Sequence, residues 1–207
     1  PSKSARQKQA TWALWIKIVI ACIPAAVLGL LFDDWMEAHL YNAYVVAATL
    51  IIYGVLFIAL ENSSITANPS ITKVGHVSTK TALFIGLFQL LSLVPGTSRS
   101  GSTILGAMVL GCSRGVAAEF SFFLGIPVMF GASFLKLVKF FVKGNVLTGP
   151  QIFYTILGMA IAFGVSVYSI QFLMGYVRRH DFKFFGYYRI ILGVVVLAYF
   201  GITALAA

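Results

Sequence analysis

Five apolar stretches, each about as long as a membrane-spanning helix, constrain this chain more than any other feature of its sequence. A helix needs roughly 20 mostly apolar residues to cross the hydrocarbon core of a bilayer. Hydrophobic residues make up 59% of the chain and charged residues only 10%, against about 25% charged in soluble domains. The sequence therefore predicts an all-α integral membrane protein with a single transmembrane domain over residues 1–207. The predicted spans are Ala13–Phe32, Asn42–Leu60, Val116–Leu135, Ile152–Leu173 and Tyr187–Leu205.

Two further apolar pieces, Ala82–Val94 and Ser102–Cys112, are too short to cross a bilayer as helices. Between them lies the polar, glycine-containing stretch Pro95–Gly101. The region 82–112 is therefore either one broken span or a re-entrant helix–loop–helix hairpin. Irregular backbone at membrane depth is tolerated only where protein or a wet cavity surrounds it, so both alternatives place this loop at a protein-lined site.

The distribution of basic residues favours the hairpin and gives an orientation. The chain carries a formal charge of +9, which on a soluble protein would suggest nucleic acid but between apolar spans indicates cytoplasmic loops. A hairpin that enters from the cytoplasm puts nine basic residues on that side and only Lys136, Lys139 and Lys143 on the other. The nine are Lys3, Arg6, Lys8, Lys73, Lys80, Arg114, Arg178, Arg179 and Lys183.

Arg99 is the candidate functional residue of this loop. An arginine near the bilayer centre costs about 2.5–3.5 kcal/mol on insertion scales, so it is rare unless it is paired or functional. The hydroxyls of Thr97, Ser98 and Ser100 surround it, and Gly96 and Gly101 allow a tight turn. With a helix N-terminus beside them, these groups are typical of an anion site, and phosphate fits best. The alternative is a structural role in which Arg99 pairs with a carboxylate.

Two polar residues inside apolar stretches are further candidates. Glu119 is expected to be a countercharge to Arg99 or Arg114 rather than a general acid–base group. Gln89 precedes the loop and is either a ligand contact or a helix–helix hydrogen bond. Glycines within the spans, Gly125 and Gly131 among them, are expected to allow close helix packing. The sequence shows no metal-ligand motif, and its two cysteines lack CxxC spacing.

The loop and its surroundings resemble a known family. Pro95-Gly-Thr-Ser-Arg-Ser-Gly101, Gly111-Cys-Ser-Arg114 and Ala117-Ala-Glu-Phe-Ser-Phe122 are similar to the second signature region of the undecaprenyl-diphosphate phosphatases, the bacitracin-resistance family of bacterial membranes. Ile23–Phe32 and Tyr188-Arg189 look like other stretches of that family. The resemblance runs along nearly the whole chain.

The resemblance implies a hydrolase that converts undecaprenyl diphosphate to the monophosphate carrier lipid of cell-wall synthesis. It implies an inner-membrane protein built from two inverted repeats, with a polyprenyl diphosphate lipid as partner, no nucleic acid and a possible homodimer. By the same resemblance Arg99 and Ser98 would be catalytic. Thr97, Ser100, Gly96, Gly101 and Gln89 would bind substrate, and Glu119 would support Arg99.

The family's first signature, with its carboxylates and histidine, has no counterpart in the sequence. We therefore expect an incomplete first repeat, with a segment missing before Pro1, and the ligands of a possible Mg²⁺ or Ca²⁺ ion in that segment. An alternative function uses the same anion-binding loop without hydrolysis, as a polyprenyl-phosphate transporter or flippase.

Overall fold

The computed structural model describes residues 5–177 and 179–206. Lys3 and Arg178, which contribute to the predicted orientation, lie outside the described residues. In this part of the chain the regular structure is helical apart from one isolated bridge, between Ile71 and Cys112. The elements are α1 (Ala5–Leu40), α2 (Ala43–Glu61), α3 (Ser64–Ala67), η1 (Val74–His76), α4 (Thr79–Leu90), η2 (Leu91–Leu93), α5 (Arg99–Val109), α6 (Arg114–Val142), α7 (Gly149–Val177) and α8 (Lys183–Ala206).

Five of these helices are long and apolar enough to cross a membrane, which confirms the predicted all-α membrane fold. The five segments that qualify are Ala5–Phe32, Ala43–Glu61, Arg114–Val142, Gly149–Val177 and Lys183–Ala204. Each contains most of one predicted span, and α1, α6 and α7 extend well beyond theirs. The chain is a multi-pass membrane protein.

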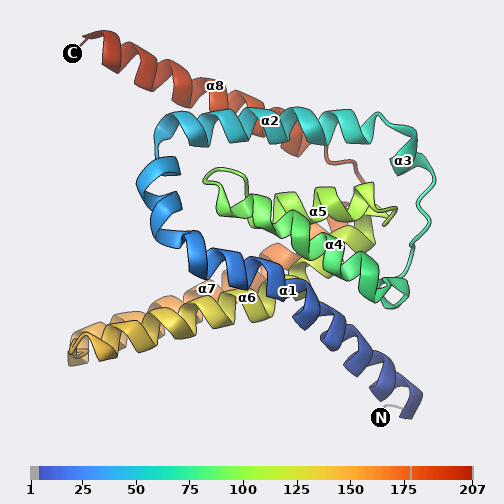
Figure 1. Cartoon of the computed structure of the whole chain (residues 1–207), viewed down its shortest axis with the longest axis horizontal. Coiled ribbons are helices and arrows are strands. Elements are labelled where there is room, and N and C mark those ends of the chain that lie inside the picture. Colours follow the sequence, from blue (N-terminus) through green and yellow to red (C-terminus); the bar gives the residue numbers. More distant parts are fainter. Residues whose placement is uncertain (1–4, 178, 207) are drawn as a thin grey trace.

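The region between the second and third spans forms two short helices, α4 and α5, which pack against each other. Ser78 caps α4 by accepting a hydrogen bond from the backbone N–H of Thr81 at 3.0 Å. The hairpin lies in the middle of the molecule, with α2 on one side and α1 on the other (Figure 1). Its depth in a membrane and the inverted-repeat architecture stay predictions.

Helices α2 and α8 form the most closely packed pair. A Cβ atom on Gly54 would lie 2.7 Å from the carbonyl oxygen of Gly186, and one on Gly193 would lie 2.8 Å from that of Ala47. Such distances leave no room for a side chain, so the two backbones touch, as is common between membrane helices. This pair forms a firm support beside the hairpin.

Helices α6 and α7 run side by side and extend away from the hairpin (Figure 1). The buried residues of α6 lie between Val116 and Gly125, where the helix packs on α5. Among the described residues of α7 only Val177 is buried. Because the exposed side chains of α7 are mostly apolar, this helix suits a lipid environment.

Candidate active site

The Pro95–Gly101 loop is held in place by the α2–α8 pair. Thr49 of α2 donates a hydrogen bond to the carbonyl oxygen of Pro95 at 2.7 Å. Arg189 of α8 donates through Nη2 to the carbonyl oxygens of Gly96 at 2.6 Å and Thr97 at 2.9 Å. Its guanidinium carbon lies 5.8 Å from the centre of the Tyr53 ring, a cation–π contact. The loop is not helical, so these side chains provide the hydrogen bonds that its backbone carbonyl groups need.

The loop backbone is unusual at two residues. Gly96 has a φ of +84°, and a Cβ atom there would lie 2.8 Å from the Cα of Val46 and closer still to the Thr49 hydroxyl. Gly96 is therefore needed for the turn and for packing on α2, not for close approach of a ligand. Ser98 has a φ of +68° and is the only non-glycine residue with positive φ in the described part of the chain. Such a conformation costs about 1–3 kcal/mol and often marks a functional site.

The side chain of Arg99 extends from the first turn of α5 toward Gly125 of α6. A Cβ atom on Gly125 would lie 2.5 Å from Nη2 of Arg99 and 3.0 Å from Nη1. The expectation that Gly125 serves helix–helix packing was wrong, because its missing side chain makes room for the guanidinium. Nη1 is buried and has no hydrogen-bond partner among the described residues. A buried guanidinium without a partner is costly, so this group is available for an anion.

Two cavities meet at the side chain of Arg99. The first, which we call the α6–α7 cavity, has a volume of about 690 Å³; its lining includes Arg99, Glu119, Phe123, Met129, Ile170 and Gln171. The second, the α1–α6 cavity, has a volume of about 410 Å³; its lining includes Cys22, Gln89, Arg99, Gly131, Lys136 and Lys139. Both have largely apolar walls, so each combines a cationic group with space for a hydrocarbon chain.

Gln89 shares the α1–α6 cavity with Arg99. The residue is only 1% exposed, and neither its amide nitrogen nor its amide oxygen has a hydrogen-bond partner in the described part of the chain. The predicted helix–helix hydrogen bond is therefore absent for this residue. An unsatisfied buried amide costs about 1–3 kcal/mol, so a ligand that pairs with it would gain that energy.

The hydroxyls of the loop lie apart from these cavities. Ser98 is exposed and caps α5 by accepting a hydrogen bond from the N–H of Gly101 at 3.3 Å, and its Oγ lies 3.4 Å from that of Ser100. Thr97 is 1% exposed, and its carbonyl oxygen is bound by Arg189. The placement of Thr97 does not support the expected contact with substrate. The structure brings Arg99, Gln89 and Glu119 onto shared cavities but leaves the three hydroxyls outside them.

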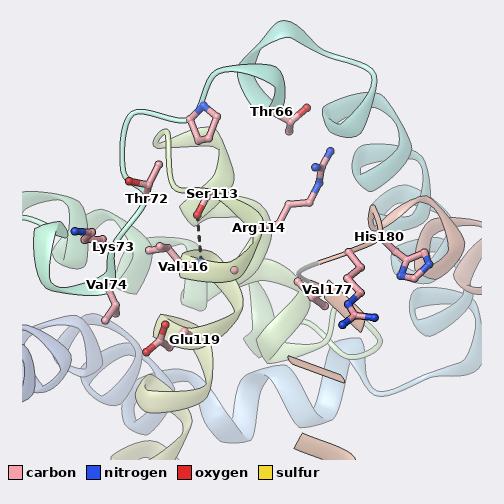
Figure 2. A pocket seen from close by; sticks show the side chains of 13 residues that line it. Thr66, Thr72, Lys73, Val74, Ser113, Arg114, Val116, Glu119, Val177 and His180 are labelled. Carbon is pink, nitrogen blue, oxygen red and sulfur yellow. Dashed lines mark hydrogen bonds between the residues drawn. The ribbon is translucent and has the colours of Figure 1, made fainter. Parts of the chain in front are cut away.

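The expected pairing of Glu119 was wrong. Glu119 forms no ion pair with Arg99 or Arg114 in the described structure. Arg114 instead binds Glu61 at the end of α2 through two guanidinium nitrogens, with Nη2 2.5 Å from Oε2 and Nε 2.9 Å from Oε1. Glu61 also accepts a hydrogen bond from the N–H of Phe182 at 2.9 Å. Figure 2 shows Arg114 and Glu119 directed away from each other around a third cavity, at the start of α6.

Two residues that matter for this arrangement were missed. Glu61 directly follows the predicted span Asn42–Leu60, and the structure buries its side chain fully. Arg189 was noted only as part of a family-like stretch. Its signal was available, since an arginine inside the predicted span Tyr187–Leu205 needs a partner or a function.

The described residues do not fit a divalent ion. Across 5–177 and 179–206, no group of three or more His, Cys, Asp or Glu side chains could hold a metal. Mg²⁺ and Ca²⁺ prefer several oxygen ligands, carboxylates above all. The expected divalent ion stays a prediction.

Comparison with known proteins agrees with the motif. The model of the family described as bacitracin resistance protein BacA matches residues 1–195. The chain belongs to the BacA family. Among similar BacA proteins are the undecaprenyl-diphosphatases of Streptococcus thermophilus (strain CNRZ 1066), with 56% identity, and Streptococcus mutans serotype c, with 55%. That of Enterococcus faecalis (strain ATCC 700802 / V583) is 51% identical.

These alignments cover nearly all of the chain and most of each relative. They include 96%, 95% and 96% of this chain and 69%, 70% and 72% of the three relatives, in the same order. The family predicted from Pro95–Gly101 and the residues after it is thereby confirmed.

Proposed function

We propose that this BacA family member removes the terminal phosphate of undecaprenyl diphosphate and releases the monophosphate carrier lipid. The observation that carries the proposal is the guanidinium of Arg99, half-buried and unpaired where two apolar-walled cavities meet. A lipid diphosphate has a multiply charged headgroup, which Arg99 can bind, and a hydrocarbon chain, which the apolar cavities can hold.

Arg99 acts on the diphosphate in this proposal. A guanidinium binds phosphate oxygens through two parallel hydrogen bonds and stabilises the charge that builds up as the phosphoanhydride bond breaks. Gln89 offers an amide donor on the α1–α6 cavity. Arg189 and Thr49 keep the loop, and with it the start of α5, in one position.

Hydrolysis also needs a group that activates the attacking water. Glu119 is the acidic residue on the α6–α7 cavity, and it is not occupied by an ion pair with Arg99 or Arg114. We propose it as the general base candidate among the described residues. Ser98, exposed at the start of α5, is the alternative nucleophile.

Phosphate release from undecaprenyl diphosphate by the purified chain in detergent tests the proposal. We expect Arg99→Ala to lower kcat/KM by about 10²–10³-fold, the effect of removing one preorganised charge-stabilising donor. Arg179→Ala, an exposed arginine that lines neither cavity of Arg99, is the matched control and should retain activity. Glu119→Gln should lower kcat by about 10²-fold if it is the base.

The outcomes separate the candidate functions. Equal activity of wild type and Arg99→Ala would contradict the proposal. Lipid binding that depends on Arg99, without phosphate release, would favour a transporter. Parallel assays with Mg²⁺, Ca²⁺ and a chelator test the proposed dependence on a divalent ion.

Location and assembly complete the proposal. A lipid carrier of cell-wall precursors is used at the bacterial inner membrane, so we propose this membrane as the site of action. We also propose a homodimer as the assembly, which cross-linking in native membranes would detect as a species of twice the mass.

A further inference from the structure

The α1–α6 cavity has a cationic end remote from Arg99. Lys136 and Lys139 line it together with Arg99 and Gln89. Arg99 contacts α6 beside Gly125, and the two lysines follow that glycine by 11 and 14 residues. At 1.5 Å per residue they lie about 16 and 21 Å further along the helix axis. The cavity therefore reaches from the middle of α6 toward its C-terminal end.

The wall between the two ends lies on one face of α6 and includes several small residues. The α6 residues that line it, from Val128 through Gly131, Ala132 and Leu135 to the two lysines, recur at helical spacing. Small residues of α1, Ala25, Ala26 and Gly29, face them. A Cβ atom on Gly131 would meet nothing within 4 Å, so the space beside it is open.

Polar side-chain groups at both ends lack partners within the described part of the chain. Lys136 and Lys139 are exposed, and neither forms an ion pair with a described residue. At the inner end, Nη1 of Arg99 and the whole amide of Gln89 are buried without hydrogen-bond partners. A lysine cluster beside a cleft raises the local concentration of anions, and unsatisfied donors at its end retain them.

We propose that the α1–α6 cavity is the access route of the phosphate-bearing end of the lipid, with Lys136 and Lys139 as its capture site. This inference rests on the proposed function, because it takes the lipid diphosphate as ligand. The lysines attract the headgroup at the end of α6, the small-residue wall lets it pass, and Gln89 and Arg99 bind it at the inner end. The two lysines are positioning residues that act on binding and leave the chemical step unchanged.

The charge part is tested with the double variant Lys136→Gln/Lys139→Gln and the control Lys143→Gln. Lys143 follows α6 directly but does not line the cavity. We expect the double variant to raise KM for undecaprenyl diphosphate about 5–10-fold at low ionic strength, with kcat unchanged, and the difference to shrink in 0.5 M salt. Lys143→Gln should change KM less than about twofold.

The steric part is tested with Gly131→Leu and the control Gly158→Leu in α7. A Cβ atom at either glycine meets nothing within 4 Å, so both variants should fold with the wild-type melting temperature. Leucine at 131 narrows the cavity and should raise KM at least about tenfold, whereas leucine at 158 should leave it unchanged. An unchanged KM in both Gly131→Leu and the lysine double variant would overturn the proposal, as would an equal effect of Lys143→Gln.

A binding measurement separates this inference from the proposed function. Equilibrium binding of a fluorescent polyprenyl diphosphate to the same variants needs no turnover. Wild-type binding that weakens in the lysine and Gly131 variants, without phosphate release, would support the route and reject the hydrolase. Competition by inorganic diphosphate that depends equally on the lysines would show that the headgroup alone is captured. Competition by the lipid diphosphate but not by inorganic diphosphate would show that the hydrocarbon chain of the lipid contributes to binding.

Discussion

The starts of α5 and α6 have similar sequences but differ in the partners of their arginines. Each helix begins with an arginine that follows a capping serine, Ser98-Arg99 in one and Ser113-Arg114 in the other. Arg114 binds Glu61 through two nitrogens, whereas Arg99 has no carboxylate partner among the described residues and lies on two cavities. The serines differ too, with φ of −63° at Ser113 and +68° at Ser98.

The difference separates a structural arginine from one available to a ligand. The α6 start is internally satisfied, because the charge of Arg114 is neutralised by a buried carboxylate that also binds a backbone N–H. The α5 start keeps a strained cap and an unsatisfied guanidinium. Such a cost is expected where binding or catalysis needs a preorganised charge.

The largest expected difference is the response to arginine-to-lysine exchange. Lysine keeps the charge but loses the paired hydrogen bonds of a guanidinium. We expect Arg99→Lys to lower kcat/KM for undecaprenyl diphosphate about 10²-fold and Arg114→Lys to lower it less than about threefold. Steady-state phosphate release checks both. An equal loss in the two variants would mean that the α5 and α6 starts are not functionally distinct.

Neutralising Arg114 should lower the stability of the protein, whereas neutralising Arg99 should not. Arg114→Gln leaves the buried carboxylate of Glu61 unpaired and should cost on the order of 2–4 kcal/mol, moderated because the side chain of Arg114 is 37% exposed. Arg99→Gln removes an unpaired half-buried charge and should leave stability unchanged or raised. The double variant Glu61→Gln/Arg114→Gln should recover part of the loss.

Denaturation in detergent, followed by tryptophan fluorescence, measures these changes. A destabilised Arg99→Gln protein would reveal a partner for Arg99 and contradict the comparison.

A smaller contrast concerns the capping serines. Glycine is nearly as good an N-cap as serine and adopts positive φ without strain. Ser98→Gly should therefore stabilise the protein by about 0.5–1 kcal/mol, and Ser113→Gly should destabilise it by a few tenths. If the Ser98 hydroxyl contacts the diphosphate, kcat/KM should fall about tenfold in Ser98→Gly alone. Unchanged activity would remove Ser98 from the catalytic residues.

The sequence predicted the fold because length and hydrophobicity alone decide which segments can cross a membrane. It also indicated the Arg99 loop, since an arginine among glycines and hydroxyls between two short apolar segments is typical of an anion site. Both inferences depend on residues that are adjacent in the chain.

What the sequence could not predict depends on contacts between distant helices. Glu61 stands at the edge of a span, and only the fold brings the end of α2 to the start of α6, where Glu61 is buried and binds Arg114, 53 residues away. The sequence suggested that Gly125 packs against another helix. The structure shows instead that it makes room for the guanidinium of Arg99, which depends on the direction of that side chain. For the same reason the sequence did not show that Arg114 pairs with Glu61 and not with Glu119.

Chemical labelling of the two cysteines tests the comparison between the α5 and α6 starts without changing the sequence. Cys112 directly precedes Ser113, and burial raises the pKa of its thiol to about 11, so only about 10⁻³ of it is thiolate at pH 8. Cys22 is half-buried and lines the α1–α6 cavity beside Arg99. We expect a membrane-permeant maleimide at pH 8 to modify Cys22 first, and undecaprenyl diphosphate to slow this reaction.

Labelling of Cys112 should stay slow at pH 8 and rise about tenfold per pH unit up to the pKa, because the raised pKa keeps the thiol protonated below it. Mass spectrometry of peptides from Cys22→Ser and Cys112→Ser assigns each adduct. Protection of Cys112 by the lipid, with no protection of Cys22, would place the ligand at the start of α6. The roles of the two helix starts would then be reversed.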